Sequence, residues 1–179
     1  MSTQTYQLDA THSAARFSVR HMMISRVHGE FTGLSGTLEF DPASPETAKT
    51  TVEIDVSTVS THQPDRDTHL KSGDFFDVAQ FPKLTFVSTG VSKQSDEEAT
   101  ITGDLTIHGV TKSVTLQVEG ATVEVKDPWG NLRLGFTGKT KIKRSDYGLT
   151  YNAALETGGV LIGDDIEITL DVQFVRPGA

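Results

Sequence analysis

The chain has 179 residues, a formal net charge of −8 and no cysteine. Its length predicts a single domain, residues 1–179, with a core large enough to be stable without cross-links. The negative charge argues against nucleic acid as a partner, because binding to phosphates requires a basic surface. The absence of cysteine excludes disulfides and thiolate chemistry.

The sequence predicts neither a membrane-spanning helix nor a secretory leader. No apolar run approaches the roughly 18 residues that a transmembrane helix requires. The N-terminal stretch MSTQTYQLDATHS has neither the basic nor the apolar region of a signal peptide. We therefore expect the chain as written to be cytoplasmic.

Alternating apolar and polar residues predict β-strands along most of the chain. In chain order, the expected strands are 6–9, 15–21, 27–31, 36–40, 52–56, 84–88, 101–107, 114–118, 121–125, 132–143 and 166–174. Each strand is apolar on one face only, which suits a β-barrel or a β-sandwich. The long alternation in 132–143 favours the barrel, since a usual strand has about five or six residues. We predict an all-β fold, an antiparallel barrel of about eight strands.

One long segment, 62–86, interrupts the strands. Asp65 is the expected N-cap of a helix of about two turns that ends at Gly73. A second turn is expected around Phe75 and Phe76, so the helical excursion spans about 65–77. A helix this short needs tertiary packing to be stable, so we expect it to pack on the barrel.

An interior cavity is one of two interpretations of the small inward residues. Gly36, Gly103, Gly138 and Thr140 are expected to leave volume unfilled inside the barrel. Glycine at these positions is equally compatible with strands that bend at barrel corners. An eight-stranded barrel can be filled by its own side chains or hold one small ligand.

No catalytic motif is present. The sequence lacks a nucleophile elbow, a P-loop, a zinc-protease helix and a dinucleotide-binding loop. His62 and His69, with two acidic residues between them, match no familiar metal site, so no metal is predicted. His21 shares the apolar face of its strand with Phe17 and Val19. This placement is typical of a core histidine and also suits a group that meets the polar end of a ligand.

Arg66 begins the helical excursion and has two interpretations. Its guanidinium either braces the segment or places a positive charge near an anionic head group.

Several motifs resemble the YceI-like family over nearly the whole chain. They are DATHS at 9–13, FSVRH at 17–21, SRVHGEF at 25–31, RDTHLKS at 66–72, DFFD at 74–77, FPKLTF at 81–86, GDLTIHGVTK at 103–112, RSDYGL at 144–149 and GDDI at 163–166. The resemblance implies a lipocalin-like barrel with an elongated apolar interior for a polyisoprenoid, either a prenyl quinone or a prenyl diphosphate. Family members are often periplasmic, and this sequence departs from them by having no leader.

We therefore predict non-catalytic binding of a polyisoprenoid or another long-chain amphiphile, for transport, storage or sequestration. No cofactor is expected beyond this ligand, and a homodimer is left open. The candidates for the cavity lining are Phe17, Val19, Phe31, Phe40, Phe75, Phe76, Phe86, Leu105, Phe136 and Leu170. The weaker candidates for the polar end are His21, Arg66 and His69.

Two alternatives remain at this point. One is an enzyme that acts on a lipid or a small amphiphile, with His21 or His69 as the general base. The other is a barrel filled by its own side chains that serves as an interaction module.

Overall fold

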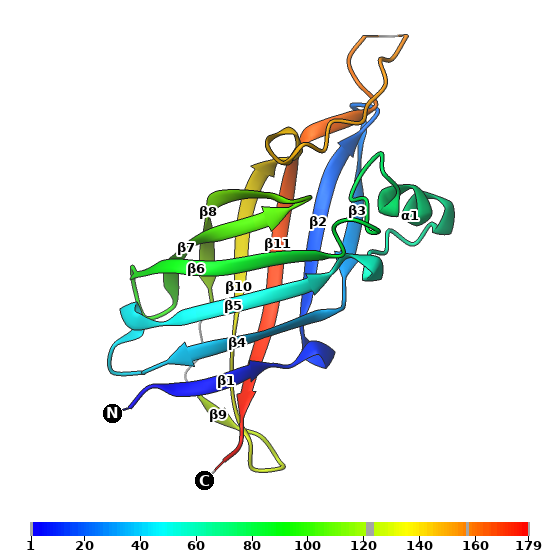
Figure 1. Ribbon diagram of the computed structural model, residues 1–179. Helices are drawn as coiled ribbons and strands as arrows, with labels where there is room; N and C mark the ends of the chain where they lie inside the picture. Colours follow the sequence, from blue (N-terminus) through cyan, green and yellow to red (C-terminus); the bar gives the residue numbers. More distant parts are fainter. Residues whose placement is uncertain (1, 121–123, 157, 179) are drawn as a thin grey trace.

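The structure of the chain, a computed structural model, describes residues 2–120, 124–156 and 158–178 (Figure 1). Its strands are β1 (Gln4–Leu8), β2 (Ala14–His21), β3 (Ser25–Phe31), β4 (Leu34–Phe40), β5 (Lys49–Asp55), β6 (Lys83–Lys93), β7 (Glu98–Ile107), β8 (Val110–Glu119), β9 (Val125–Lys126), β10 (Leu132–Lys143) and β11 (Ile162–Arg176). The helix α1 spans Pro64–Lys71, and four short 3₁₀ helices are η1 (Ala10–His12), η2 (Pro45–Thr47), η3 (Val56–Thr58) and η4 (Arg144–Tyr147).

Eight of the described strands form a closed antiparallel barrel, which confirms the predicted fold. The circuit runs β11-β1-β4-β5-β6-β7-β8-β10, and the pairing of β10 with β11 closes it. The first part of β11 pairs with β2 and its last residues pair with β1. The hairpin of β2 and β3 therefore extends the wall beyond β1, at the end of the barrel where α1 lies (Figure 1).

The observed strand boundaries agree best with the predicted ones where the alternation of apolar and polar residues is longest. β10 has the predicted bounds 132–143, and β11 begins four residues before the predicted 166. β6 continues to Lys93, beyond the predicted 88, because it pairs along β7 past a register shift between Ser88 and Gly90. The predicted strand 121–125 lies largely outside the described residues, and only Val125 belongs to a described strand.

The short helix forms where the sequence predicts one, but its N-cap is not Asp65. Gln63 is the N-cap, and its side-chain carbonyl accepts a hydrogen bond from the backbone N–H of Arg66 at 3.1 Å. Pro64 occupies the first helical position, where its fixed φ and missing N–H cost nothing. Asp65 instead lies in the first turn, where its negative charge interacts favourably with the helix dipole. Phe75 and Phe76 follow in hydrogen-bonded turns rather than in a second helix.

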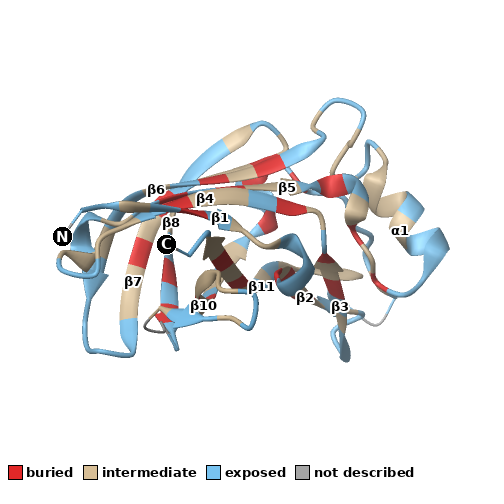
Figure 2. Ribbon diagram, turned by 90° about the horizontal axis from the view of Figure 1, so that it is seen from below, coloured by how far each residue is buried: buried red, intermediate tan, exposed pale blue. Residues whose placement is uncertain are grey.

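One half of the barrel is filled with side chains. Tyr6 and Phe174 are completely buried, and Leu38 and Val118 are nearly so. β1 pairs with β4 and with the last residues of β11, near the end at which both chain termini lie (Figures 1 and 2). Side chains thus fill this part of the barrel interior, and the mainly apolar cavity lies toward α1. A second, more open and more polar pocket lies beside Gly120 and Phe136.

Two of the small inward residues, Gly36 and Gly103, leave no empty volume, whereas a Cβ on Gly138 would fit at 3.7 Å from Leu116 and Thr140 lines the cavity toward α1. A Cβ on Gly103 would lie 2.5 Å from the Phe86 ring and 2.6 Å from the Val87 carbonyl oxygen. A Cβ on Gly36 would overlap the backbone carbonyl of Thr51. Glycine is needed at both positions for close packing, because any side chain would displace a ring or a neighbouring strand.

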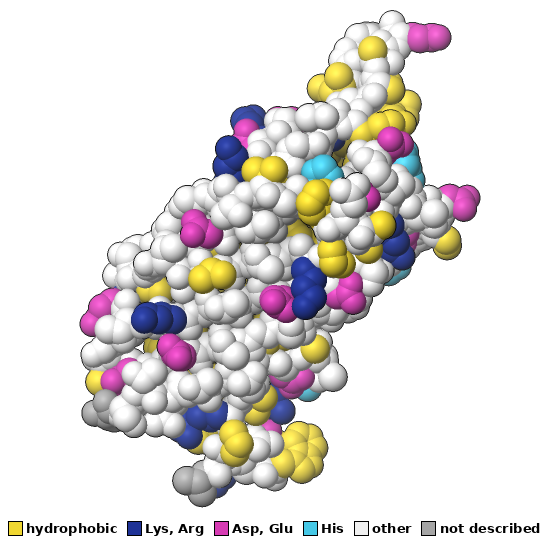
Figure 3. All heavy atoms as spheres, in the orientation of Figure 1, with side chains coloured by type: hydrophobic (Ala, Val, Ile, Leu, Met, Phe, Trp, Pro, Cys, Tyr) yellow, Lys and Arg dark blue, Asp and Glu magenta, His cyan; other side chains and the backbone are white. Residues whose placement is uncertain are grey.

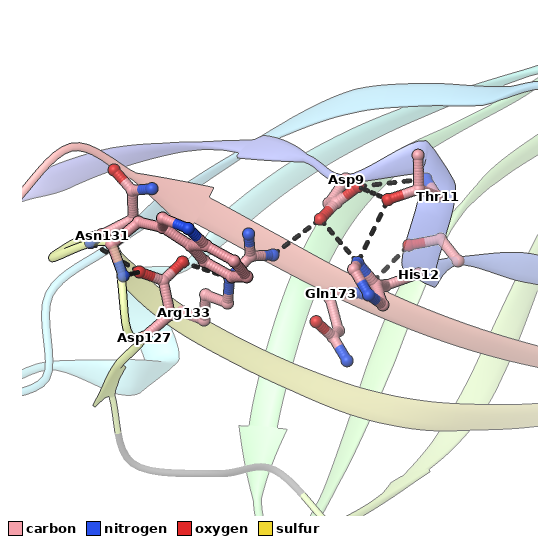
Figure 4. A network of polar contacts seen from close by, with 9 residues as sticks. Asp9, Thr11, His12, Asp127, Asn131, Arg133 and Gln173 are labelled. Carbon is pink, nitrogen blue, oxygen red and sulfur yellow. Dashed lines mark hydrogen bonds and ion pairs between the residues drawn. The ribbon is translucent and has the colours of Figure 1, made fainter.

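A polar network ties the first corner of the chain to the start of β10 (Figure 4). Asp9 caps η1, accepts hydrogen bonds from Thr11, and contacts His12 at 2.9 Å. Arg133 bridges Asp9 at 2.6 Å and Asp127 at 2.8 Å. Arg133 lies on the outward face of β10 with Lys139, Lys141 and Lys143, but its guanidinium joins two carboxylates that are far apart in the sequence.

The network predicts a loss of stability in acid. The Thr11 hydroxyl, together with Arg133 and His12, holds the pKa of Asp9 well below its usual value near 3.8. Because the pKa is lower in the folded state, this stabilisation is complete above pH about 4 and is lost as the pH falls below that value. Asp9→Asn should be less stable than the wild type at pH 7, and the difference should shrink by pH 3.

Urea unfolding at pH 7 and pH 3 measures this difference. Asp96→Asn is the control, since Asp96 is fully exposed and contacts only Lys93. A stability difference for Asp9→Asn that stays constant between the two pH values would contradict the assignment.

Candidate functional site

The unfilled half of the barrel contains a cavity of about 440 Å³. This volume lies within the range of roughly 300–1,000 Å³ that is usual for small-molecule sites. The inward faces of most barrel strands line it, and β2, α1 and the turn after α1 close it from the side. Most of its lining is apolar because every strand turns its apolar face inward.

Eight of the ten predicted lining residues lie on this cavity. They are Phe17, Val19, Phe31, Phe75, Phe76, Phe86, Leu105 and Leu170. Phe40 and Phe136 are not part of the lining, so these two predictions are corrected. Phe40 is opposite Gln4 at the end of β4, and Phe136 stacks on the buried Phe174 with ring centroids 6.1 Å apart. Both residues belong to the filled half, because strand alternation fixes the face of a residue but not its height in the barrel.

The segment after α1 covers one side of the cavity. The Phe76 ring meets Phe31 edge-on at 5.7 Å, and Phe31 in turn contacts Phe17 at 5.6 Å. The turn is held by hydrogen bonds from the Phe76 N–H to the Leu70 carbonyl and from the Phe75 N–H to the Ser72 carbonyl, each 3.0 Å long. The long connection therefore serves to place aromatic side chains against the ligand space.

All three residues predicted for a polar end lie at the cavity. His21, Arg66 and His69 line it together with Tyr151, and we call these four residues the polar rim. Arg66 and Tyr151 are exposed, and the two histidines are half-buried. This gradient of exposure marks the place where the cavity opens to solvent.

Arg66 is held at the rim by its own segment. Its Nε donates to the Thr61 hydroxyl at 2.7 Å and its Nη2 to the Thr61 carbonyl at 2.9 Å. Asp67 accepts from both the backbone and the hydroxyl of Thr61. Within the described part of the chain, the guanidinium forms no ion pair, so it presents a positive charge to the cavity. The structure thus shows the bracing role that the sequence allowed for Arg66, and it places the guanidinium at the cavity.

His69 and Tyr151 form the aromatic part of the rim. The Nε2 atom of His69 lies 2.8 Å from the Asp74 carboxylate. The His69 ring is edge-on to both Phe75 and Tyr151 at 5.0 Å. Tyr151 was missed from the sequence, because it lies in an irregular stretch without any periodic signal.

Arg144 was also missed as a cavity residue, although it belongs to a recognised motif. It lines the cavity and is only 6 % exposed. Its guanidinium donates to the carbonyls of Leu149 at 2.7 Å and Gly163 at 2.8 Å, and more weakly to that of Ile162. Burial lowers the pKa of Arg144 below its usual value, and the Asp164 carboxylate partly opposes this shift. The sequence gives no sign of this burial, since an arginine after a lysine-rich strand suggests a solvated surface.

Among the described residues, no group of three or more histidine, cysteine or acidic side chains is placed to hold a metal ion. None of the described helices is both long enough and apolar enough to cross a membrane.

Comparison with known proteins agrees with this architecture. The family model for the YceI-like domain matches residues 6–174. A UPF0312 protein of Staphylococcus aureus is 38% identical over 169 residues, which are 94% of this chain and 96% of the relative. The Campylobacter jejuni YCEI protein has a similar structure, with a TM-score of 0.73 and 35% identity over 88% of this chain and 89% of that one.

A more distant structure has the same fold. A polyisoprenoid binding domain from Saccharophagus degradans aligns with a TM-score of 0.68 at 18% identity, covering 96% of this chain and 98% of that one. The match of the family model over residues 6–174, together with the identity to the S. aureus protein, settles the relationship that the motifs predicted. The chain belongs to the YceI-like domain family.

Proposed function

We propose that this protein binds a polyisoprenoid lipid in the cavity, without chemical conversion, for transport, storage or sequestration. One observation carries this proposal: a cavity of about 440 Å³ inside the barrel is lined mainly by apolar side chains and has the polar rim where it opens. An amphiphile with a long chain and a small head group matches this distribution. The S. degradans domain of the same fold supports the ligand class, since it is described as polyisoprenoid binding.

The energetics favour such a ligand. Each methylene group transferred from water into the cavity contributes about 0.8 kcal/mol. A few isoprene units therefore offset the cost of association, which is several kcal/mol. The polar rim then orients the lipid, because its head group keeps contact with water and polar side chains only if it lies at the open end of the cavity.

Native mass spectrometry of the protein purified from its host tests the proposal. We expect a bound mass that fits a prenyl quinone or a prenyl diphosphate, and saturable uptake of an added prenyl quinone by delipidated protein. Protein that is always empty and takes up neither lipid type would refute the proposal.

Arg66 is proposed to recognise an anionic head group. Arg66→Ala should weaken binding of a prenyl diphosphate by about tenfold or more, because one charge-assisted contact is lost. Binding of an uncharged prenyl quinone should change less than about twofold. The free energy of unfolding should fall by about 1–3 kcal/mol, since two part-buried hydrogen bonds to Thr61 are lost.

Calorimetric titration of both lipids distinguishes these effects. Lys71→Ala is the matched control, because Lys71 lies on α1 but does not line the cavity. Equal losses for the charged and the uncharged lipid would make Arg66 a structural residue only.

A further inference from the structure

Four exposed apolar side chains project beside the opening of the cavity. Met22, Met23 and Ile24 form the turn between β2 and β3 and are 43 %, 52 % and 79 % exposed. Val160, 39 % exposed, lies in the loop between β10 and β11. We call these four residues the apolar tip. They are half of the large hydrophobic residues that the described part of the chain exposes.

The tip is continuous with the cavity. His21 and Leu161 line the cavity and are the chain neighbours of Met22 and Val160. The Met22 N–H donates to the Leu161 carbonyl at 2.7 Å, which joins the turn to the loop. In the view of Figure 3, hydrophobic side chains gather on this projecting end of the molecule. Apolar side chains therefore lie beside the opening on the side of α1, next to the rim residue His21 and below an acidic side chain at the outermost point in Figure 3.

The stability of the turn does not explain why methionine occupies positions 22 and 23. Met22 and Met23 both have a left-handed backbone, with φ of 55° and 63°. A turn of this kind between paired strands favours Asn and Gly, whereas a long side chain is strained there. Solvation also disfavours methionine at an exposed position. Residues that both local conformation and solvation disfavour point to a partner that covers them.

We propose that the apolar tip docks the open end of the cavity onto a lipid bilayer, where the polyisoprenoid enters and leaves the barrel. This inference rests on the proposed function, since it concerns how that ligand reaches the cavity. The tip is convex and its four side chains carry no charge, so it suits fluid acyl chains, which need no matching shape. A bilayer also contains lipids of the ligand's class in its apolar layer.

Docking removes the main barrier to transfer. A polyisoprenoid that leaves through water must expose its chain, and each exposed methylene lowers the population of the free state about fourfold. At a docked opening, the chain passes from one apolar medium to another. The transfer rate should then rise with vesicle concentration, whereas release into water would make it independent of vesicles.

Flotation with phosphatidylcholine vesicles tests docking directly. Wild-type protein should float with the vesicles, and the double variant Met22→Asn with Met23→Gly should bind them at least about tenfold more weakly. Asn-Gly suits the left-handed turn, so the variant should be as stable as the wild type or more so. Unfolding therefore cannot account for its loss of binding.

Trp129 supplies the control at the other end of the barrel. It is 81 % exposed in the turn between β9 and β10, which lies at the end opposite the tip (Figure 1). Trp129→Gln should leave flotation unchanged within about twofold. Docking through the tip is overturned if wild-type protein does not float, if the double variant floats equally well, or if Trp129→Gln abolishes flotation.

Ligand titration separates this proposal from the proposed function. Wild type and the double variant should take up a prenyl quinone with equal affinity within about twofold, because neither methionine lines the cavity. If both take up the quinone and float equally, only the docking fails. If neither takes up any polyisoprenoid, the proposed function fails, whatever the flotation result.

Discussion

Thr140→Trp should weaken prenyl quinone binding by about 100-fold or more without unfolding the protein. Thr140 lines the cavity from the centre of β10, opposite Ile168 of β11, which also lines it. An indole at this position would occupy space that the lipid chain needs, and overlapping atoms cannot both be accommodated in a closed wall. The free energy of unfolding should change by about 1 kcal/mol or less, because the added ring fills a cavity rather than a packed core.

Lys141→Trp is the matched control for this prediction. Lys141 is the next residue of the same strand and points outward, where it pairs with Asp165. It should bind the quinone as well as the wild type does. Fluorescence titration of both variants and urea unfolding measure the two effects. Unchanged affinity in Thr140→Trp would show that the lipid does not occupy the barrel interior.

Arg144→Met should lower the free energy of unfolding by about 3 kcal/mol. The variant keeps a chain of similar length but leaves the carbonyls of Leu149 and Gly163 without their donor. A buried acceptor that loses its partner costs about 1–3 kcal/mol. These carbonyls belong to the segments that follow η4 and begin β11, so the open end of the barrel should become locally disordered.

Arg144→Lys tests whether a positive charge alone is sufficient to keep the stability that Arg144 provides. A lysine has one ammonium and cannot reach two separate carbonyls as the planar guanidinium does, so it should recover only part of the stability. Chemical unfolding gives the energies, and hydrogen exchange at 145–149 and 162–164 localises the effect. If Arg144→Met were as stable as the wild type, the hydrogen bonds seen here would contribute nothing to the fold.

The faces of the strands follow from the sequence for a simple reason. A period of two is local, so the residues of 132–143 alone specify which side chains point inward. Six of the candidate lining residues lie on strands and face the cavity by this rule, whereas Phe75 and Phe76 reach it from the turn after α1. The sequence also predicted the short helix, although its N-cap is Gln63, directly before Pro64, and not Asp65.

The height of a residue along the barrel axis cannot be predicted in this way. It depends on the register between strands that are far apart in the chain. Phe136 and Thr140 share one face of β10, yet the first stacks on Phe174 and the second lines the cavity. The pairing of β10 with β8 and β11 decides this, and no local pattern encodes it. The same holds for the ion pair between Arg133 and Asp9, which are 124 residues apart in the sequence.

The sequence by itself determined the family, the all-β class, the inward faces and the short helix, since each depends on neighbouring residues or on motifs. Only the tertiary structure decided that one half of the barrel is filled and the other is open. It also decided that Arg144 is buried, that Tyr151 joins the polar rim, and that Met22 and Met23 project beside the opening. These features arise when strands distant in the sequence pair and close the barrel, because pairing brings together side chains that no local pattern relates.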